Sequence, residues 1–370
     1  MIVISINDYS DTVGGAEQAI SNTNSALSKL GVKVFTYSLS SSSESILNYL
    51  DRFFSIFHFL KFCLFILKHK PNIIHAHNTS RFISPSPLLA ARFFRVPVIM
   101  TFHDYHLICP KTWMMYSKCL ECPYGFSTKC LLSNCETFHT GVLWFPYQWL
   151  KWFKVLIHRA IIKYTVNIAL CPNYDLQRWV DSSLMLKTIY LPNFLPVNTI
   201  KINRTPSYYL FVGRLSKEKG VSSLITTFAK FSHEKLVIIG DGPEKDSLIK
   251  LTERLGLSNR VTFLGKVSHS NLQFYYSKAY ALVVPSIWKE NNPLVILESL
   301  SVGIPVIATS RGGLLDFAKN GAACFNYNTE SELIKLLKYV KSYNRLVTLP
   351  EIYSESVHLE RLVSIYSSFS

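Results

Sequence analysis

The chain has 370 residues, of which 48% are hydrophobic and 17% charged, and its formal net charge is +15. This length suits two domains, and the apolar content can build sizeable cores, which excludes a largely disordered protein. The excess of positive charge predicts an anionic partner, such as a phosphorylated small molecule, an acidic membrane surface or a nucleic acid.

The N-terminal half alternates short β-branched runs with helical patterns. We expect strands over Ile2–Ile6, Val32–Tyr37, Ile73–His75 and Val96–Phe102, and helices over Ala16–Leu30 and Ser84–Phe94. The opening apolar run has no basic stretch before it, which favours a strand over a signal peptide. The longest apolar stretch, Phe53–Leu67, is interrupted by a histidine and a lysine and falls short of the ~20 apolar residues that span a bilayer.

The pattern restarts after Pro192–Pro196, a proline-bounded segment that suits a linker. The second set of strands is expected over Tyr208–Val212, Leu236–Ile239, Val261–Leu264, Ala281–Val284 and Pro305–Ala308, with helices over Val221–Phe231, Lys245–Leu255, Pro293–Val302 and Glu330–Tyr339. This alternation predicts an α/β fold class with two Rossmann-like, doubly wound parallel-sheet domains that face a cleft. We expect the first domain at residues 1–193, the second at 197–350, and a C-terminal helix over 351–370 that packs back on the first.

The strongest motif is Pro285–Glu298, with the sequence PSIWKENNPLVILE. Asn292 and Pro293 predict an N-cap followed by a proline at the first helical position. Free N–H groups at that helix start suit a diphosphate at the carboxyl end of the sheet. Glu290 and Glu298 suit hydrogen bonds from the hydroxyls of a sugar and a ribose. The alternative is two solvated glutamates beside a core helix.

A second motif, FVGRLSKEKG, follows the first strand of the second half and contains Gly213, Arg214, Lys219 and Gly220. We expect Arg214 and Lys219 to converge on the face that carries the helix starting at Pro293. An arginine and a lysine together are well suited to neutralise a diphosphate, although such a segment alone is also a common basic loop.

The first half offers fewer candidates. Gly14 and Gly15, between the first strand and helix, either bring the backbone close to an oxyanion or form a simple tight turn. His103 follows the fourth strand and is expected to point into the cleft, although a lone histidine there is more often structural. His75 and His77, near the end of the third strand, are secondary candidates.

The order of these motifs, together with Gly240–Pro243 and Glu290-x7-Glu298, resembles the family 4 retaining glycosyltransferases of the GT-B fold. The resemblance runs from residue 14 to about residue 316, and the glutamate pair with Arg214 and Lys219 is its most specific part. It implies a first domain on the acceptor side and a second that binds a nucleotide sugar. Asn291-Asn292-Pro293 stands where the family has Gly-Phe-Gly, which affects the expected contacts to the donor sugar.

The resemblance also assigns roles. Arg214 and Lys219 would bind the donor diphosphate, Glu298 the ribose, and Glu290 the transferred sugar, with His103 near the reacting centre. The catalytic residues implied are His103, Glu290, Arg214 and Lys219. The donor-binding residues implied are Gly15, Gly213, Arg214, Lys219, Phe263, Leu264, Glu290, Asn291, Asn292, Pro293, Leu294 and Glu298.

The implied reaction is a front-face transfer that retains anomeric configuration and requires no cofactor, because basic side chains and helix N-termini meet the developing charge. The partners implied are a UDP- or GDP-linked sugar and a glycan acceptor carried on a lipid diphosphate, in bacterial surface-polysaccharide (O-antigen, capsule or exopolysaccharide) assembly. Alternatives are a nucleotide-sugar 2-epimerase of the same fold, or a non-enzymatic protein that binds an anionic ligand or nucleic acid. No nucleic-acid module appears, so we expect no nucleic-acid partner.

A cysteine-bearing insert is expected at about residues 109–145. Its Cys119, Cys122, Cys130 and Cys135 have a spacing that suits a structural zinc site, with free thiols and disulfides as alternatives. Its position after the fourth strand suggests a role in acceptor recognition.

Two segments mix aromatic and basic residues, Phe53–Lys70 and Trp144–Arg159. They could lie at the headgroup level of an anionic bilayer, or form core helices with a few exposed basic residues. The first alternative predicts a cytoplasmic protein held peripherally on the inner face of the cytoplasmic membrane.

Overall fold

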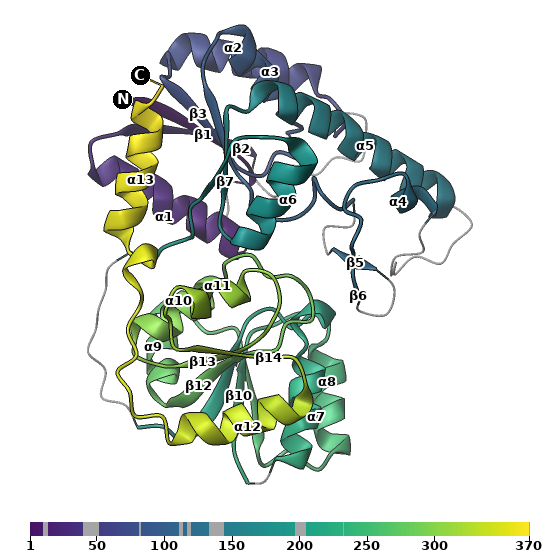
Figure 1. Cartoon of the computed structure of the whole chain (residues 1–370), viewed down its shortest axis with the longest axis vertical. Coiled ribbons are helices and arrows are strands. Elements are labelled where there is room, and N and C mark those ends of the chain that lie inside the picture. The colour runs from purple at the N-terminus through teal and green to yellow at the C-terminus, as the bar shows by residue number, and fades with distance from the viewer. Residues whose placement is uncertain are drawn as a thin grey trace. The chain divides into compact units, whose positions relative to one another are not determined.

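The computed structural model of the chain describes residues 1–9, 14–39, 52–80, 83–110, 114–116, 120–132, 144–196, 205–231 and 233–369. The chain forms two compact units (Figure 1). The first comprises Met1–Pro196 and Glu355–Ser370, and the second comprises Val197–Ser354.

The first unit contains a six-stranded parallel sheet in the order β2-β1-β3-β4-β7-β8. Its strands are β1 (Ile2–Tyr9), β2 (Lys33–Leu39), β3 (Ile73–Ala76), β4 (Val98–Thr101), β7 (Ile168–Cys171) and β8 (Thr188–Tyr190). The four predicted strands are confirmed. The last two strands, β7 and β8, extend the sheet and were not predicted. Each is a run of only three or four residues, which is too short to show a clear periodicity.

Helices flank this sheet and connect its strands. They are α1 (Gly15–Lys29), α2 (Ile56–His69), α3 (Ser86–Phe93), α5 (Trp144–Thr165), α6 (Tyr174–Leu184) and α13 (Glu355–Ser367). The segment between β4 and α5 adds a short antiparallel pair, β5 (Met115–Tyr116) and β6 (Leu120–Glu121), and a single turn, α4 (Lys129–Leu132). No helix in the described part of the chain is both long and apolar enough to span a bilayer.

The C-terminal helix α13 belongs to the core of the first unit, although it follows the second unit in sequence. Leu362 and Tyr366 are fully buried with Ile73 and Leu170 of the sheet. His358 also fixes the helix, because its Nδ1 lies 2.8 Å from the carbonyl oxygen of Pro192. Figure 1 shows α13 beside α1 in this unit.

The second unit contains a parallel sheet in the order β11-β10-β9-β12-β13-β14. Its strands are β9 (Tyr208–Val212), β10 (Leu236–Ile239), β11 (Val261–Gly265), β12 (Ala279–Val284), β13 (Val306–Thr309) and β14 (Cys324–Tyr327). Its helices are α7 (Val221–Lys230), α8 (Lys245–Arg254), α9 (His269–Ser277), α10 (Leu294–Ser301), α11 (Leu314–Lys319) and α12 (Glu330–Lys341), with 3-10 turns at Lys217–Lys219 and Glu351–Tyr353.

The chain order of this sheet reverses between β9 and β12. Such a switch point is where open α/β sheets bind ligands, beyond the carboxyl ends of the strands. The loops that leave β9 and β12 contain the two strongest sequence motifs, so the topology brings those motifs together. Two doubly wound parallel sheets confirm the predicted fold class.

Candidate functional site

Glu290 is the best-defined residue of the site in the second unit. It lies in the loop between β12 and α10 and is only 6% exposed. Lys219 Nζ and Ser286 Oγ each donate a hydrogen bond to its Oε1 over 2.6 Å. Burial alone would raise the pKa of Glu290, but the charge of Lys219 and these hydrogen bonds lower it below its ordinary value. Glu290 is therefore ionised at neutral pH.

The backbone around Glu290 is held by close approaches that only glycine allows. Gly220 has φ +67°, and a Cβ there would lie 2.1 Å from the carbonyl oxygen of Pro285. Gly312 has φ +54°, and a Cβ there would lie 2.6 Å from the carbonyl oxygen of Glu290. That oxygen accepts a hydrogen bond from the N–H of Gly313 at 2.7 Å. Ser286 and the pair Gly312-Gly313, which follows β13 after two intervening residues, were not predicted as site residues, although two adjacent glycines beyond a strand end were a usable signal.

The start of α10 differs from the prediction. The helix begins at Leu294, and Pro293 is the N-cap residue, with no side-chain cap. The prediction that Asn292 caps a helix beginning at Pro293 is therefore wrong by one residue. Pro293 has φ −69° and ψ +126°, an extended conformation that places it before the helix. Asn292 is instead buried within the loop.

Glu298 lies in the second turn of α10 and is held by residues of the preceding helix, α9. The hydroxyl of Tyr276 donates to Glu298 Oε2 at 2.9 Å, and His269 Nε2 lies 3.7 Å from Oε1. Burial raises the pKa of Glu298. The structure thus distinguishes the two glutamates, because Glu290 is paired with a cation and Glu298 mainly with a tyrosine hydroxyl. Its predicted contact with a ribose stays a prediction.

Arg214 is arranged differently from Lys219. It follows β9 and is exposed, and within the described residues its guanidinium forms no ion pair. Lys219 is instead engaged with Glu290, and its ammonium lies 5.2 Å from the ring centroid of Trp288. Within the described residues, Lys219 thus contacts the Glu290 loop through an ion pair, whereas Arg214 forms no such pair with it. Phe263 and Leu264 lie in the edge strand β11, where Leu264 is exposed.

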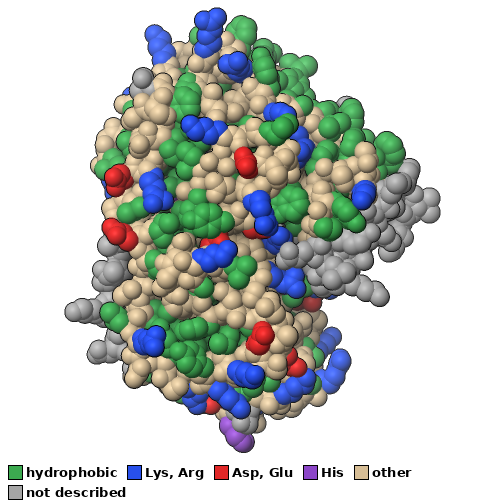
Figure 2. All heavy atoms as spheres, in the orientation of Figure 1, with side chains coloured by type: hydrophobic (Ala, Val, Ile, Leu, Met, Phe, Trp, Pro, Cys, Tyr) green, Lys and Arg blue, Asp and Glu red, His purple; other side chains and the backbone are tan. Residues whose placement is uncertain are grey.

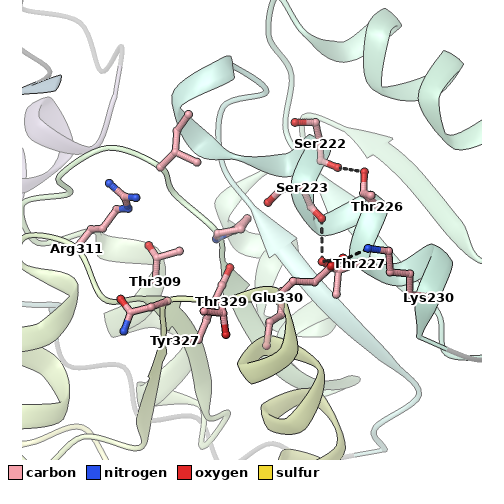
Figure 3. A pocket seen from close by; sticks show the side chains of 14 residues that line it. Ser222, Ser223, Thr226, Thr227, Lys230, Thr309, Arg311, Tyr327, Thr329 and Glu330 are labelled. Atoms are coloured by element: carbon pink, nitrogen blue, oxygen red, sulfur yellow. Dashed lines mark hydrogen bonds and ion pairs between the residues drawn. The ribbon is translucent and has the colours of Figure 1, made fainter. Parts of the chain in front are cut away.

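A separate hollow lies beside this loop in the second unit, with a volume of about 480 Å³. Figure 3 shows hydroxyl-bearing side chains of α7 on one side and Arg311 on the other. Lys230 pairs with Glu330 at its rim at 2.7 Å. None of the predicted site residues lines this hollow, although Pro285 and Ile287 of the Glu290 loop do.

The first unit places His103 at the carboxyl end of its sheet, just beyond β4. His103 Nε2 lies 3.0 Å from His77 Nδ1, and burial lowers the pKa of His103 to about 4. Burial would raise the pKa of the neighbouring Asp104, but the charge and hydrogen bonds of His106 lower it to about 2. Gly15 is exposed at the first position of α1, and a Cβ there would meet nothing within 4 Å.

The cysteine insert is described only in part. Cys119 and Cys135 lie outside the described residues. Cys122 is buried, Cys130 is half-buried, and both are free thiols, with Cys130 Sγ donating to the carbonyl oxygen of Gly125 at 3.3 Å. Within the described ranges, no group of three or more histidines, cysteines or carboxylates is arranged to hold a metal ion. The predicted zinc site stays a prediction.

Comparison with known proteins finds a family model that matches the second unit. Residues 197–348 match the family model described as "Glycosyl transferases group 1". The chain is 38% identical over 128 residues to an uncharacterized glycosyltransferase of Methanocaldococcus jannaschii, which is 33% of either chain. It is 29% identical over 172 residues to the alpha-monoglucosyldiacylglycerol synthase of Acholeplasma laidlawii, which is 44% of this chain and 43% of that protein. The alignments thus span less than half the length of these relatives.

Solved structures resemble the whole chain. A sucrose-phosphate synthase from Thermosynechococcus elongatus matches with a TM-score of 0.72 and 16% identity, over 99% of this chain and 98% of that one. The lipopolysaccharide outer core galactosyltransferase WaaB and Anabaena HepE in complex with UDP each match with a TM-score of 0.69 over both full chains, at 17% and 16% identity. At this identity the likeness shows the fold, which is that of two-domain GT-B glycosyltransferases.

Proposed function

We propose that the chain is a retaining glycosyltransferase that moves a hexose-type sugar from a nucleotide diphosphate sugar to a glycan acceptor. The observation that carries the proposal is the cluster of Lys219, Ser286 and Glu290 at the switch point of a unit that matches a glycosyltransferase family model. A buried carboxylate with one oxygen held by two donors is oriented for a sugar hydroxyl at its other oxygen.

The donor is bound through its diphosphate and its ribose. Arg214, Lys219 and the N–H groups at the start of α10 neutralise the diphosphate, and the departing β-phosphate accepts the proton of the acceptor hydroxyl. Glu298 receives the ribose hydroxyls, and His103 contacts the transferred sugar. The transfer reaction itself requires no cofactor. The donor is UDP- or GDP-linked, and the UDP complex of Anabaena HepE favours UDP.

Nucleotide binding and product analysis test this proposal. UDP or GDP should raise the melting temperature of the protein, since a ligand that binds only the folded state stabilises it, whereas NAD should not. With a sugar-loaded nucleotide and a glycan acceptor, a longer glycan with a retained anomeric configuration should form. An epimerised nucleotide sugar formed without any acceptor would instead establish the 2-epimerase alternative.

The proposed acceptor is a glycan on a lipid diphosphate, used in surface-polysaccharide assembly at the inner face of the cytoplasmic membrane. The outward side of α2 supports this location, because Phe57, Leu60 and Leu64 recur there at helical spacing and are exposed. Lys61 and Lys68 lie between and beside these residues and suit anionic headgroups. Figure 2 shows hydrophobic side chains gathered over α2 and α5.

The basic residues of α5 contribute less to this surface than their sequence suggests. Lys154 donates to the carbonyl oxygen of Ser80, and Arg159 donates to those of Leu107 and Ser183. These two cations therefore hold the first unit together. A test of membrane binding should accordingly alter α2.

Sedimentation with anionic phospholipid vesicles tests the location. The double variant Leu60→Glu with Leu64→Glu should remain in the supernatant, because both exposed side chains lose their affinity for the bilayer. Leu346→Glu is the matched control, since Leu346 is an exposed leucine of the second unit. Equal vesicle binding by the double variant and the wild type would contradict the location.

The proposal includes a structural zinc ion held by Cys119, Cys122, Cys130 and Cys135, which would fold the insert that recognises the acceptor. Four thiolates are a frequent ligand set for structural zinc. Metal analysis of the purified protein should find zinc, and Cys122→Ser should lose it. If the purified wild-type protein contained no zinc, this part of the proposal would be wrong.

A further inference from the structure

Four histidines of the first unit surround one small cavity. His75, His77, His103 and His358 line it together with Thr101 and Asn193, and α1 closes one side. Its volume is about 20 Å³, which is enough for one water molecule.

The parallel pairing of β3 and β4 brings two of these imidazoles together. His75 is opposite Ile99 and Ala76 is opposite Met100, so the residues just beyond the two strand ends leave the same edge of the sheet. His77 and His103 meet there, with 3.0 Å between His77 Nδ1 and His103 Nε2.

His77 has little freedom to move. It is 2% exposed, and its ring centroid lies 4.3 Å from that of His75. His75 is itself fixed, because its Nε2 lies 2.8 Å from Thr101 Oγ1 and its Nδ1 lies 2.6 Å from the hydroxyl of Tyr366 in α13. His77 is thus held by a neighbour that is anchored on both sides.

The protonation of the pair follows from its burial. Burial lowers the pKa of His103 to about 4 and that of His77 well below its ordinary value, so both rings are neutral at pH 7. A neutral imidazole has one N–H and one acceptor nitrogen, so one ring must donate to the other.

The remaining nitrogen of His77 indicates the direction of this hydrogen bond. His77 Nε2 is buried and has no hydrogen-bond partner in the described part of the chain. If His103 were the donor, His77 would have its proton on Nε2, as a buried N–H without a partner. A bare acceptor nitrogen is the less costly arrangement, since orphaned buried N–H groups are rarer than under-satisfied acceptors.

We propose that His77 is a positioning residue for His103: its Nδ1–H donates to His103 Nε2 and keeps the proton of His103 on Nδ1. The imidazole of His103 is then held in one orientation and one tautomer, with an N–H rather than a bare nitrogen at Nδ1. The consequence for catalysis rests on the proposed function, in which His103 contacts the transferred sugar. In that setting His77 acts through His103 and does not touch the sugar.

Long-range proton–nitrogen NMR of ¹⁵N-histidine-labelled protein tests the tautomer directly. We expect His103 in the Nδ1–H form, identified by loss of its signals in a His103→Ala sample. The spectrum is recorded on the protein without donor, so its result does not depend on sugar transfer. His103 with its proton on Nε2 would overturn the proposal.

Three variants of His77 separate positioning from packing. The amide nitrogen of His77→Asn replaces Nδ1, that of His77→Gln replaces Nε2, and His77→Phe keeps the ring shape without a donor. We expect His77→Asn to retain the Nδ1–H form of His103 and most of kcat. His77→Gln and His77→Phe should lose that form, and their kcat should fall roughly 10- to 100-fold with the donor KM unchanged, as when a group that orients a ligand is removed.

The ranking of the three variants by kcat distinguishes a positioning role of His77 from a packing role. Equal loss of kcat in all three would overturn the positioning role, because it would show a packing defect. If the NMR result is as expected and no nucleotide sugar supports transfer by the wild type, the proposed function fails while the hydrogen bond stands. Melting temperatures of all three variants identify any that does not fold.

Discussion

The candidate sites of the two units are built from opposite kinds of interaction. In the second unit, Glu290 and Lys219 form a charged contact between two loops. In the first unit, His77 and His103 form a neutral contact between two strand ends. A loop that carries charge suits the ionic part of a ligand, whereas two neutral rings, one buried and one half-buried, suit hydroxyls and exclude charge. The comparison predicts that the two units respond differently to charge removal, to acid and to backbone strain.

Removal of the ammonium of Lys219 should have the largest effect. Lys219→Ala leaves the buried carboxylate of Glu290 without its cation, so transfer activity should fall ~100- to 1000-fold, as for other preorganised charge-stabilising groups. Stability should fall by about 2 to 3 kcal/mol, less than for a fully buried pair because Lys219 is partly exposed. Product formation and urea unfolding measure the two effects.

Lys230→Ala is the matched control for this variant. Lys230 also forms an ion pair in the second unit, with Glu330, but both side chains are exposed. Its removal should cost less than about 1 kcal/mol and leave activity unchanged. Similar losses of activity and stability in the two variants would show that the ion pair at the Glu290 loop contributes no more than an exposed surface ion pair.

Acid should unfold the first unit before the second. Burial lowers the pKa of His75 to about 3 and that of His358 to about 4, so the folded unit stays unprotonated while the unfolded chain binds protons below pH 6.5. Stability is therefore complete above pH 6.5 and is lost as pH falls towards 4, by about 1.4 kcal/mol per pH unit for each such histidine. Hydrogen exchange between pH 7 and 4 should show α13 and β3 opening first.

The second unit provides the internal comparison for this experiment. Its histidines, His233 and His269, are both exposed. The stability that Glu290 contributes is present above the ordinary carboxylate pKa and is lost only as pH falls through its lowered folded value. If both units unfolded at the same pH, the buried histidines would not make the first unit more sensitive to acid than the second.

Backbone strain at Gly312 should have a smaller effect, confined to the second unit. Gly312→Ala combines positive φ with a Cβ that meets the carbonyl oxygen of Glu290, so we expect a cost of about 2 to 3 kcal/mol and a raised donor KM. Gly321→Ala is the control, because Gly321 also has positive φ but open space around it. It should cost only about 1 kcal/mol and leave the donor KM unchanged.

The smallest effect is expected at Arg214. Because its side chain is exposed, Arg214→Ala should change stability by less than about 0.5 kcal/mol. If it binds the donor diphosphate, the donor KM should rise roughly tenfold, which corresponds to about 1.4 kcal/mol. An unchanged KM would limit the charged site to Lys219 and the start of α10.

The sequence predicted the sheets better than it predicted the sites. Strands such as Tyr208–Val212 and Leu236–Ile239 have the predicted bounds, because buried parallel strands are short, continuous apolar runs between turn signals. Lys219 and Glu290 could be assigned to one site because the loops of neighbouring strands meet at a switch point.

The sequence could not show which side chains form hydrogen bonds with the predicted site residues. Ser286 and Tyr276 hold the two glutamates, but nothing in their local sequence indicates a contact across a loop or between helices. His77 resembled an ordinary strand-end histidine until the pairing of β3 and β4 placed it beside His103. The cap of α10 was misplaced because Asn-Pro fits two helix starts that differ by one residue.

Because α13 packs in the first unit although it follows the second unit in sequence, only the second unit is a continuous, separable segment of the chain. The second unit is a continuous segment with its own core, so we expect residues 197–354 to fold alone and to be exchangeable between related chains as a cassette. The first unit cannot be cut out in the same way. A chain that stops before residue 355 lacks Leu359, Leu362 and Tyr366, and with Tyr366 it loses the hydroxyl that fixes His75. A swapped cassette must therefore leave the last helix of its host in place.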